Sequence, residues 1–523
     1  MNSVEIWEIA AFIFYLGIMI VIGAVYSRKN QKSEDYFLGG RSLGGLVAAF
    51  SAQASDMSGW LLMGLPGAIF LSGLSGDGWI AIGLLIGTAL NWIVVASPLR
   101  RYTIEAGNSV TLPKFFENRY KDEKKILMII SSIIIALFFT VYTASAFASG
   151  GKLFNSVFHL DYHLALSIGA AVILLYTFLG GFMAVCTTDF IQGSLMIVAL
   201  LTVPMVAISI MNGNGQTITE GLINNGIADT RSFTDFFTGT NAIHIISGMA
   251  WGLGYFGMPH ILVRFMAVKN EKEMNKSKVI AISWVTLSLA FAVVIGIVGR
   301  AFMDNSLFKE LNEGGSVTSE YIFIEMIKRV FTEEMHLAVI AGIFLCGFLA
   351  AIMSTADSQL LVSASAIAED IYKGVINKNA DDKSVLRLSR IAIVVIAVIA
   401  FIIAWNPDSS IMSLVSDAWA GLGAAFGPLV LMSLFWRRTN LQGAIAGLVS
   451  GAAVVIVWDY LPIIGGQTIY TATGLYSLVP GFFISLMAIV IVSLLNEAPS
   501  EDILNTFDKV HAKEELQAAR GYK

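Results

Sequence analysis

Thirteen apolar segments, each long enough to cross a membrane as a helix, follow one another along the 523 residues of this chain. A membrane-spanning helix needs about 20 mostly apolar residues. The chain is 56% hydrophobic and only 14% charged, whereas about 25% is usual in soluble proteins. The segments are Ile6–Tyr26, Leu43–Phe70, Trp79–Leu99, Ile126–Phe154, Leu164–Phe182, Phe190–Met211, Ala242–Leu262, Val279–Phe302, His336–Ile367, Ile391–Trp405, Ile411–Phe435, Gln442–Tyr460 and Tyr476–Leu495. The pattern predicts an all-α integral membrane protein with about 13 transmembrane helices.

The composition and the motifs exclude several classes of protein. A net charge of −5 excludes the basic surface of a nucleic-acid binder. The two cysteines, Cys186 and Cys346, are too few for a disulfide framework or a cysteine-ligated metal site. No polar segment contains a Walker A or HExxH motif, and the glycine-rich run from Gly39 to Gly44, which includes a GxSxG match, lacks a preceding strand. We therefore expect neither an enzyme nor an ATP-driven pump, and no organic cofactor.

Basic residues are distributed unequally between the two sides of the predicted bundle. Of the 33 Lys and Arg residues, 27 lie in loops that follow odd-numbered segments or in the C-terminal tail. Because positively charged loops stay in the cytoplasm, we expect the N-terminus outside and a short cytoplasmic tail at 496–523. The loops 212–241 and 303–335 are then external, and both are polar enough to carry short surface helices.

The second segment carries polar residues where a membrane helix should be apolar. From Ser51 to Trp60 it reads SAQASDMSGW, and Pro66 follows. An ionised carboxylate at the bilayer centre costs about 2.5–3.5 kcal/mol on insertion scales. The pattern indicates a helix that unwinds within the membrane and offers carbonyl and hydroxyl oxygens to a small hard cation. A kinked helix with serines bonded to their own carbonyls is the alternative, but it leaves Asp56 unexplained.

The seventh segment is interrupted in a similar way. From Trp251 to His260 it reads WGLGYFGMPH, so that three glycines and a proline lie among aromatic residues. Broken helices that open two successive five-segment units indicate an inverted-repeat transporter with its substrate site at the membrane midplane. An aromatic belt at the membrane interface is the alternative, but Trp251 and Tyr255 lie in mid-segment.

A third polar group lies in the ninth segment. Ser354, Asp357 and Ser358 are spaced i, i+3 and i+4, so they share one helical face. Asp189, at the start of the sixth segment, adds another intramembrane carboxylate. We expect Asp189, Asp357 and Ser358 to surround a second cation; a neutral, hydrogen-bonded Asp357 is the alternative. The three polar breaks contain no Lys or Arg, which favours a neutral or zwitterionic substrate.

Four motifs, spread over nearly the whole chain, resemble those of the sodium/solute symporter family. They are DYFLGGRSLG from Asp35, ASDMSGWLLMGLPG from Ala54, GLGYFG from Gly252 and AWAGLGAAFGP from Ala418. The first is family-wide, and the second and third are characteristic of the family's proline branch. The resemblance implies a LeuT-type core of two inverted five-helix repeats, about 43–211 and 242–435, with broken helices. Both repeats would belong to a single transmembrane transporter domain of residues 1–495.

The same resemblance implies a set of site residues. Sodium would be bound by the backbone carbonyls of Ala54, Met57 and Ala351 and by the hydroxyls of Ser354 and Thr355. The residues expected to take part in sodium coupling are Ser55, Asp56, Ser58 and Gly59. The proline-site pattern falls on Trp60, Tyr142, Trp251, Tyr255 and Pro259. An acid at position 357 departs from the proline branch, whereas some sialate and sugar relatives bind a second sodium near there, so the ion stoichiometry stays open.

The residues and the resemblance together predict sodium-coupled uptake of L-proline by alternating access across the cytoplasmic (inner) membrane. Within the family, the alternative is another small solute, such as a different amino acid, pantothenate or a sugar. A membrane sensor would need an output domain beyond the short tail, and a channel would need a continuous polar lining. The expected partners are L-proline, sodium as the coupling ion and membrane lipid, without nucleic acid or an obligate protein partner.

Overall fold

The computed structural model describes residues 3–27, 33–179, 181–303 and 315–521, and every regular element within these ranges is a helix. Extended backbone occurs in the same ranges only as isolated bridges, one of which pairs Leu43 with Val268. Ten of the described helices are long and apolar enough to cross a membrane. The predicted all-helical membrane class is therefore confirmed.

The predicted number of about 13 spans is not confirmed. The ten apolar spans are Ile6–Gly23, Trp60–Glu105, Ile126–Phe158, Phe182–Gly213, Glu271–Phe302, Ala338–Ile376, Asp382–Ile403, Ile411–Phe435, Leu441–Tyr460 and Leu478–Leu495. The predicted segments Leu43–Phe70 and Ala242–Leu262 do not qualify as single helices because breaks divide them. The fifth predicted segment is represented by a shorter apolar stretch, Tyr162–Leu175.

The first part of the chain supplies most of the helices around the first break. Its elements are α1 (Ser3–Ser27), α2 (Ser33–Leu38), η1 (Gly39–Arg41), α3 (Gly45–Asp56), η2 (Trp60–Gly64), α4 (Leu65–Leu90), η3 (Asn91–Val95), α5 (Ala96–Glu105), α6 (Leu112–Tyr120), α7 (Ile126–Phe158), α8 (Tyr162–Leu179) and α9 (Phe182–Gly213). At Gly73 the backbone of α4 leaves the helical conformation, with φ +70°. A Cβ atom there would stand 2.4 Å from the carbonyl oxygen of Phe233, so the bend requires glycine.

The second part of the chain contains the second break and the C-terminal helices. Its elements are α10 (Ile218–Asn224), α11 (Thr230–Thr234), α12 (Ala242–Gly254), η4 (Tyr255–Gly257), α13 (Pro259–Ala267), α14 (Glu271–Phe302), α16 (Gly315–Ser319), α17 (Ile322–Ile327), η5 (Lys328–Glu334), α18 (Ala338–Ser365), η6 (Ala366–Ile376), α19 (Asp382–Ile403), α20 (Ile411–Phe435), α21 (Leu441–Tyr460), α22 (Ile469–Thr473), α23 (Leu478–Leu495) and α24 (Glu501–Gly521). The expected short surface helices are present in 212–241 as α10 and α11. The described part of 303–335 also contains short helices, but α17 is mostly buried; residues 304–314 lie outside the described ranges.

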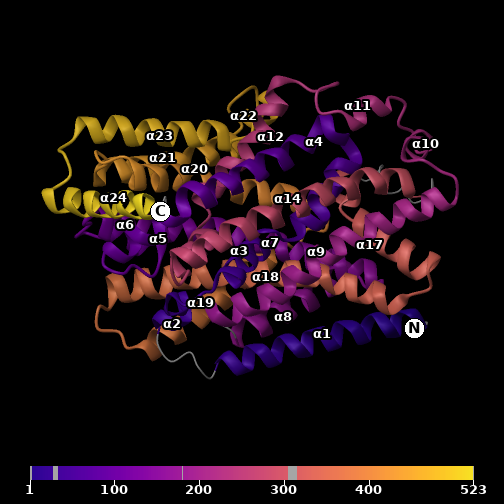
Figure 1. The fold of residues 1–523 in the computed structure, drawn as a ribbon, viewed down its shortest axis with the longest axis horizontal. Helices are drawn as coiled ribbons and strands as arrows, with labels where there is room; N and C mark the ends of the chain where they lie inside the picture. The colour runs from indigo at the N-terminus through magenta and orange to yellow at the C-terminus, as the bar shows by residue number, and fades with distance from the viewer. Residues whose placement is uncertain (1–2, 28–32, 180, 304–314, 522–523) are drawn as a thin grey trace.

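The long helices run side by side along the longest axis of the molecule (Figure 1). In this view α3, α7 and α18 lie near the middle, and α1 lies along one side (Figure 1). α18 packs against α7, α9 and α1, and α14 packs against α3, α4 and α9. The helices that carry the predicted site are therefore enclosed by other helices.

Glycine faces bring α12 unusually close to α4. A Cβ atom on Gly252 would stand 2.2 Å from the carbonyl oxygen of Gly83, and one on Gly87 would stand 2.2 Å from the carbonyl oxygen of Gly252. Small residues of this kind allow membrane helices to approach closely. This contact sets the position of α12, and so of the second break that follows it, relative to the end of α4.

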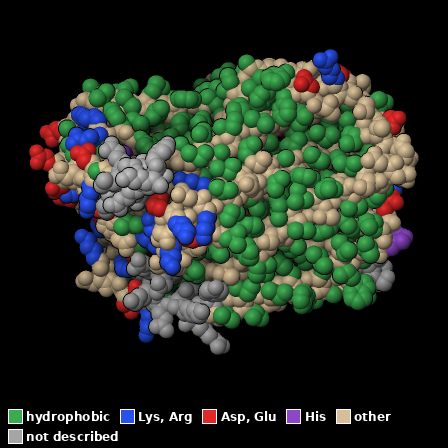
Figure 2. Space-filling view, viewed as in Figure 1, with side chains coloured by type: hydrophobic (Ala, Val, Ile, Leu, Met, Phe, Trp, Pro, Cys, Tyr) green, Lys and Arg blue, Asp and Glu red, His purple; other side chains and the backbone are tan. Residues whose placement is uncertain are grey.

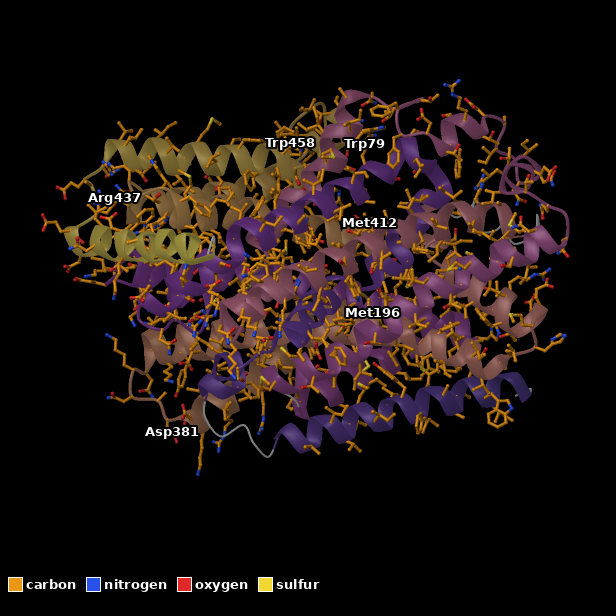
Figure 3. The ribbon with its side chains drawn as sticks, viewed as in Figure 1. Trp79, Met196, Asp381, Met412, Arg437 and Trp458 are labelled. Carbon is orange, nitrogen blue, oxygen red and sulfur yellow. The ribbon has the colours of Figure 1, made fainter. Side chains whose placement is uncertain are left out.

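An apolar surface covers the flank of the molecule, and basic side chains gather at one end of it (Figure 2). The helix α24 lies at this end, near Arg437 (Figures 1 and 3). Arg437 donates two hydrogen bonds to Asp508, at 2.8 and 2.9 Å, and Lys121 forms an ion pair with Asp502 at 2.8 Å. The tail 496–523 thus contains a docked helix that the sequence analysis did not predict. Some of the Lys and Arg residues on which the predicted orientation rests lie in 28–32, 304–314 and 522–523, outside the described residues.

Candidate functional site

The second predicted segment is broken inside the bundle. The helix α3 ends at Asp56, and η2 begins at Trp60. Between them, Met57 has non-helical backbone angles of φ −88° and ψ 83°. The Ser58 N–H donates to the Asp56 carbonyl at 3.1 Å instead of continuing the α-helical pattern to Ala54. The break therefore frees the carbonyl of Ala54, as the sequence indicated.

Hydroxyl groups of α18 meet this freed carbonyl. Ser354 Oγ lies 2.7 Å from the Ala54 carbonyl oxygen and 3.1 Å from that of Ala351, and Thr355 Oγ1 lies 3.4 Å from the Ala54 oxygen. Met57, the remaining predicted sodium ligand, belongs to the same break, and all of these residues are fully buried. Uncharged carbonyl and hydroxyl oxygens beside a broken helix suit sodium. We refer to these five residues as the oxygen cluster.

Asp56 is directed toward the second broken helix. Its Oδ2 accepts a hydrogen bond of 2.7 Å from the Tyr255 hydroxyl. Its backbone carbonyl accepts hydrogen bonds from Trp60 Nε1 at 2.9 Å and from the Tyr142 hydroxyl at 3.3 Å. Three of the five predicted substrate residues thus converge on one residue of the first break.

The remaining residues predicted for sodium coupling stabilise the break from within. Ser55 Oγ donates to the Ala52 carbonyl at 3.1 Å, and Ser58 Oγ accepts a hydrogen bond of 3.4 Å from the Trp60 N–H. At Gly59, a Cβ atom would stand 2.2 Å from the Ser149 hydroxyl of α7. These contacts hold the shape of the backbone around Asp56.

The second break lies where α12 gives way to η4 and then to α13. Pro259 occupies the first turn of α13, where its missing N–H costs no helical hydrogen bond. The Asn91 carboxamide, at the end of α4, donates to the Tyr255 carbonyl at 2.9 Å. This side chain satisfies a carbonyl in the break and ties it to the neighbouring helix. The predicted interruption of the seventh segment is confirmed.

Aromatic rings from three elements form a continuous cluster beside the second break. Trp419 Nε1 donates to the Trp251 carbonyl at 2.8 Å, and the Trp419 ring meets Tyr255 edge to face at 5.0 Å between centroids. The Trp251 ring stacks on Tyr476 at 5.2 Å. A Cβ atom on Gly254 would stand 2.0 Å from Trp419 Nε1, so glycine is needed for this approach. We call Trp251, Tyr255, Trp419 and Tyr476 the aromatic cluster.

A cavity of about 770 Å³ reaches the aromatic cluster. Trp251 and Tyr476 are among its lining residues, together with Gly64 and Met412 (Figure 3). Its walls come from the first half of α4 and the beginnings of α12 and α20. The opposite end of α20 leads to Arg437 and the docked α24. The cavity therefore opens at the end of the bundle remote from α24.

A much smaller pocket lies on the other side of the second break. It measures about 20 Å³, and Pro259 and Arg264 are among its lining residues. Of the five predicted substrate residues, Trp251 lines the large cavity and Pro259 lines this pocket, whereas Trp60, Tyr142 and Tyr255 are among the lining residues of neither. Access to the two sides of the break is unequal.

The residues predicted for a second cation lie together in a buried cluster. Ser51 Oγ donates to Asp189 Oδ2 at 2.6 Å. The Arg264 guanidinium lies 3.3 Å from Asp189 Oδ2 and 2.6 Å from Ser358 Oγ. Ser358 Oγ is in turn 3.4 Å from Asp357 Oδ1. Four helices, α3, α9, α13 and α18, supply these groups.

Arg264 is the member of this cluster that the sequence analysis missed. Arg264 follows the predicted seventh segment, Ala242–Leu262, and would lie in the next loop, but α13 extends to Ala267 and leaves Arg264 only 1% exposed. The cluster thus holds one guanidinium group and two carboxyl groups, and the guanidinium pairs with Asp189. Among the described residues, Asp189 Oδ1 and Asp357 Oδ2 have no hydrogen-bond partner. The second cation stays a prediction.

Other site residues were also missed, for understandable reasons. Trp419 belongs to the motif that begins at Ala418, which could have pointed to it. Asn91 and Tyr476 carry no comparable signal, because single amide and aromatic residues occur in many membrane helices. Their importance arises from contacts between elements that are far apart in the sequence.

Comparison with known proteins gives one family match. The model of the family described as "Sodium:solute symporter family" matches residues 36–451. The high-affinity proline transporter PutP of Bacillus subtilis is 45% identical over 491 residues, which cover 94% of this chain and 98% of that protein. The sodium/proline symporter of Escherichia coli is 44% identical over 506 residues, which cover 96% of each chain.

Solved structures share the fold at much lower sequence identity. A sodium-coupled sialic acid symporter, in a substrate-bound outward-open state, aligns with a TM-score of 0.73 at 18% identity, over 95% of this chain and 99% of that one. The nucleobase-cation-symport-1 family transporter MHP1 aligns with a TM-score of 0.53 at 12% identity, over 92% and 99%. This chain therefore has the overall helical arrangement of these transporters.

Proposed function

Because the chain belongs to the sodium:solute symporter family, we propose that it carries L-proline and sodium together across the membrane, in the direction of uptake. Support comes from curated relatives that are named as proline transporters and are 43–45% identical over nearly the whole chain. The structural observation that carries the proposal is the hydrogen bond between Asp56 and Tyr255. It joins the break beside the oxygen cluster to the aromatic cluster.

Sodium binds at the oxygen cluster. Its ligands are the carbonyls of Ala54, Met57 and Ala351 and the hydroxyls of Ser354 and Thr355. Because these groups come from the end of α3, the first break and α18, ion binding holds the broken helix and α18 together. It also fixes the backbone next to Asp56, so the carboxylate stays in position for Tyr255. Sodium thereby favours the arrangement of the aromatic rings that binds the substrate, and Ser55, Ser58 and Gly59 maintain the break.

L-proline binds beside the second break. Trp251 and Tyr255 cover the apolar pyrrolidine ring and offer aromatic faces to its ammonium group, while Trp60 and Tyr142 complete the site around Asp56. Backbone N–H groups at the break face the carboxylate. Pro259 preserves the broken backbone and lies on the path toward the smaller pocket.

The sodium gradient supplies the energy. One positive charge that moves inward through about 100 mV releases about 2.3 kcal/mol, and about 1.4 kcal/mol corresponds to a tenfold ratio. The membrane potential alone then supports roughly fiftyfold accumulation of a zwitterion. A single ion for each proline is sufficient for uptake.

Alternating access follows from two inverted repeats of the LeuT type, at about 43–211 and 242–435, within one transporter domain of residues 1–495. The repeats begin with the two broken helices, which is the pattern expected of such transporters. The N-terminus is outside and the tail 496–523 cytoplasmic, in the inner membrane of a bacterium. In this orientation the large cavity opens to the outside, and the small pocket lies on the cytoplasmic side.

A second cation binds between Asp189, Asp357 and Ser358. Arg264 neutralises only one of the two carboxylates, so one further positive charge would balance the cluster. We expect a charge-to-proline flux ratio near two in proteoliposomes, falling toward one in Asp357→Ala. A ratio of one in the unmodified protein would exclude this second ion, and it would leave the sodium site at the oxygen cluster in place.

Another small solute is the alternative substrate, such as a different amino acid, pantothenate or a sugar. The test is competition of labelled L-proline uptake by an unlabelled panel of these solutes in proteoliposomes with a sodium gradient. We expect L-proline to compete at the lowest concentration. A different solute that competes at a concentration at least tenfold lower would replace proline as the substrate.

A further inference from the structure

We propose that Tyr476 sets the size of the ring that the substrate site accepts, although this residue lies outside the two proposed repeats. The inference rests on the proposed function and deepens it. Tyr476 lies two residues before the last long apolar helix, α23, and it lines the 770 Å³ cavity with Trp251. It is therefore a wall residue supplied by the C-terminal part of the chain.

Two hydrogen bonds hold Tyr476 between α12 and α20. Its hydroxyl donates to the Ser416 carbonyl at 2.8 Å, and its backbone N–H donates to Ser247 Oγ at 3.1 Å. The side chain is only 5% exposed. Because both ends of the residue are fixed to different helices, the ring has a defined position in the cavity wall.

The ring of Tyr476 packs directly on a residue of the proposed substrate site. Its centroid lies 5.2 Å from that of Trp251, and the two planes are inclined by 21°. Trp251 is also nearly parallel to Trp419, at 6.3 Å and 28°. Two neighbouring rings thus fix the indole of Trp251, and one of them, Tyr476, also faces the cavity.

The segment around Tyr476 is built as a wall rather than as a loose loop. Trp458 Nε1 donates to the Leu475 carbonyl at 2.9 Å (Figure 3), which ties α21 to the residue before Tyr476. Tyr470 and Gly474 of the same connection also line the cavity. A change at Tyr476 should therefore alter the space beside Trp251 while the surrounding connection keeps its position.

The size of the side chain at position 476 should then control ring selectivity. Removing the phenol in Tyr476→Ala opens space next to Trp251, so a six-membered cyclic imino acid should fit better. A larger ring in Tyr476→Trp should have the opposite effect and favour a four-membered substrate. Tyr476→Phe keeps the ring and loses only the hydrogen bond to Ser416, so it should retain the preference for the five-membered ring.

The experiment is competition of labelled L-proline uptake in proteoliposomes by pipecolate, with a six-membered ring, and by azetidine-2-carboxylate, with a four-membered ring. In Tyr476→Ala we expect the preference for proline over pipecolate to fall at least tenfold, with sodium activation within twofold of the unmodified protein. Tyr470→Ala is the matched control, because Tyr470 lines the same cavity but is 49% exposed. Tyr476→Leu provides a second small variant if Tyr476→Ala does not fold.

The outcomes separate this inference from the proposed function. Unchanged ring preference in Tyr476→Ala or Tyr476→Leu, or an equal change in Tyr470→Ala, would overturn the role of Tyr476 alone. Opposite shifts in Tyr476→Ala and Tyr476→Trp would support it, because general damage to the protein does not change sign with side-chain size. Unmodified protein without sodium-dependent proline uptake would overturn both the proposed function and this inference.

Discussion

At the scale of single residues, the site depends on polar atoms that are buried in the helix bundle, away from water. The Ala54 carbonyl lacks its helical partner and meets two hydroxyls of α18, and Asp56 holds the Tyr255 hydroxyl. A buried polar group that loses its only partner costs about 1–3 kcal/mol. Small changes to these side chains should therefore have large and specific effects.

The hydroxyls of the oxygen cluster provide the first such change. Ser354→Ala and Thr355→Ala each remove one hard oxygen ligand and leave the aromatic cluster unchanged. We expect the sodium concentration for half-maximal uptake to rise at least about tenfold, because the ion loses one ligand. The apparent affinity for proline at saturating sodium should change less than about threefold. Sodium activation curves and proline saturation curves measure the two effects.

The control for this prediction lies on the same helix. Ser363 is another fully buried serine of α18, about two and a half turns beyond Ser354. Ser363→Ala should leave sodium activation unchanged. If Ser354→Ala and Thr355→Ala both kept normal sodium activation, the oxygen cluster would not be the sodium site.

The bond between Asp56 and Tyr255 gives a second residue-scale prediction. Asp56→Asn weakens this hydrogen bond and Tyr255→Phe removes it; such a bond is worth about 1.5–3 kcal/mol when one partner is charged. Each variant should reduce the initial rate of sodium-dependent uptake about tenfold or more. The uptake rate of the double variant should lie within about threefold of that of the slower single variant. A double-mutant cycle measures this coupling. If the fold reduction in uptake rate of the double variant equalled the product of the two single reductions, the two residues would act independently.

Sequence alone could identify some of these residues. Asp56 and Ser354 could be identified because polar residues stand out within apolar segments. Arg264 was misassigned because a basic residue near the end of an apolar segment normally marks a loop, although the apolar residues Phe265 to Val268 follow it. Tyr476 could not be identified, because its contacts with Trp251 and Ser416 arise only when α23 packs against the core.

At the scale of helices, glycine and proline determine where the elements stop. The two interrupted segments were predictable, since three glycines and a proline, or an Asp with Ser and Gly, cannot continue a regular apolar helix. The number of about 13 spans is not confirmed, because breaks divide the second and seventh predicted segments and a shorter apolar stretch, Tyr162–Leu175, represents the fifth. The helix α24 was also missed. It docks through Ile503, Phe507 and Val510, which are at most 9% exposed, and through charged contacts such as that between Arg437 and Asp508. The spacing of these three apolar residues, i, i+4 and i+7, is the signal in the sequence that could have indicated an amphipathic helix.

The close approach of α4 and α12 gives a prediction at this scale. A Cβ atom on Gly252 would stand 2.2 Å from the backbone oxygen of Gly83, which has little freedom to move. Gly252→Ala should therefore separate the helices and destabilise the protein by about 1–3 kcal/mol, as overpacking does. Thermal unfolding in detergent should show a lower midpoint.

Gly17→Ala is the matched control for Gly252→Ala. A Cβ atom on Gly17 of α1 would have nothing within 4 Å, and alanine is the better helix former. Its unfolding midpoint should equal or exceed that of the unmodified protein. Equal midpoints for both variants would show that the Gly83–Gly252 contact does not determine stability.

At the scale of the whole molecule, the two sides of the site differ in access. A cavity of about 770 Å³ reaches the aromatic cluster from one end, and only a pocket of about 20 Å³ lies beyond the second break. This asymmetry is what one state of an alternating-access transporter requires. It was not visible in the sequence, because the residues around each opening come from helices in both halves of the chain.

The most direct test of the account is the dependence of uptake on the direction of the sodium gradient. Purified protein in proteoliposomes should accumulate labelled L-proline transiently above the external concentration when sodium is high outside. Reversing the gradient should drive preloaded proline out, and Ser354→Ala should need more sodium for the same rate. Accumulation that proceeds equally well with choline in place of sodium, or that ignores the reversal, would contradict sodium-coupled proline transport.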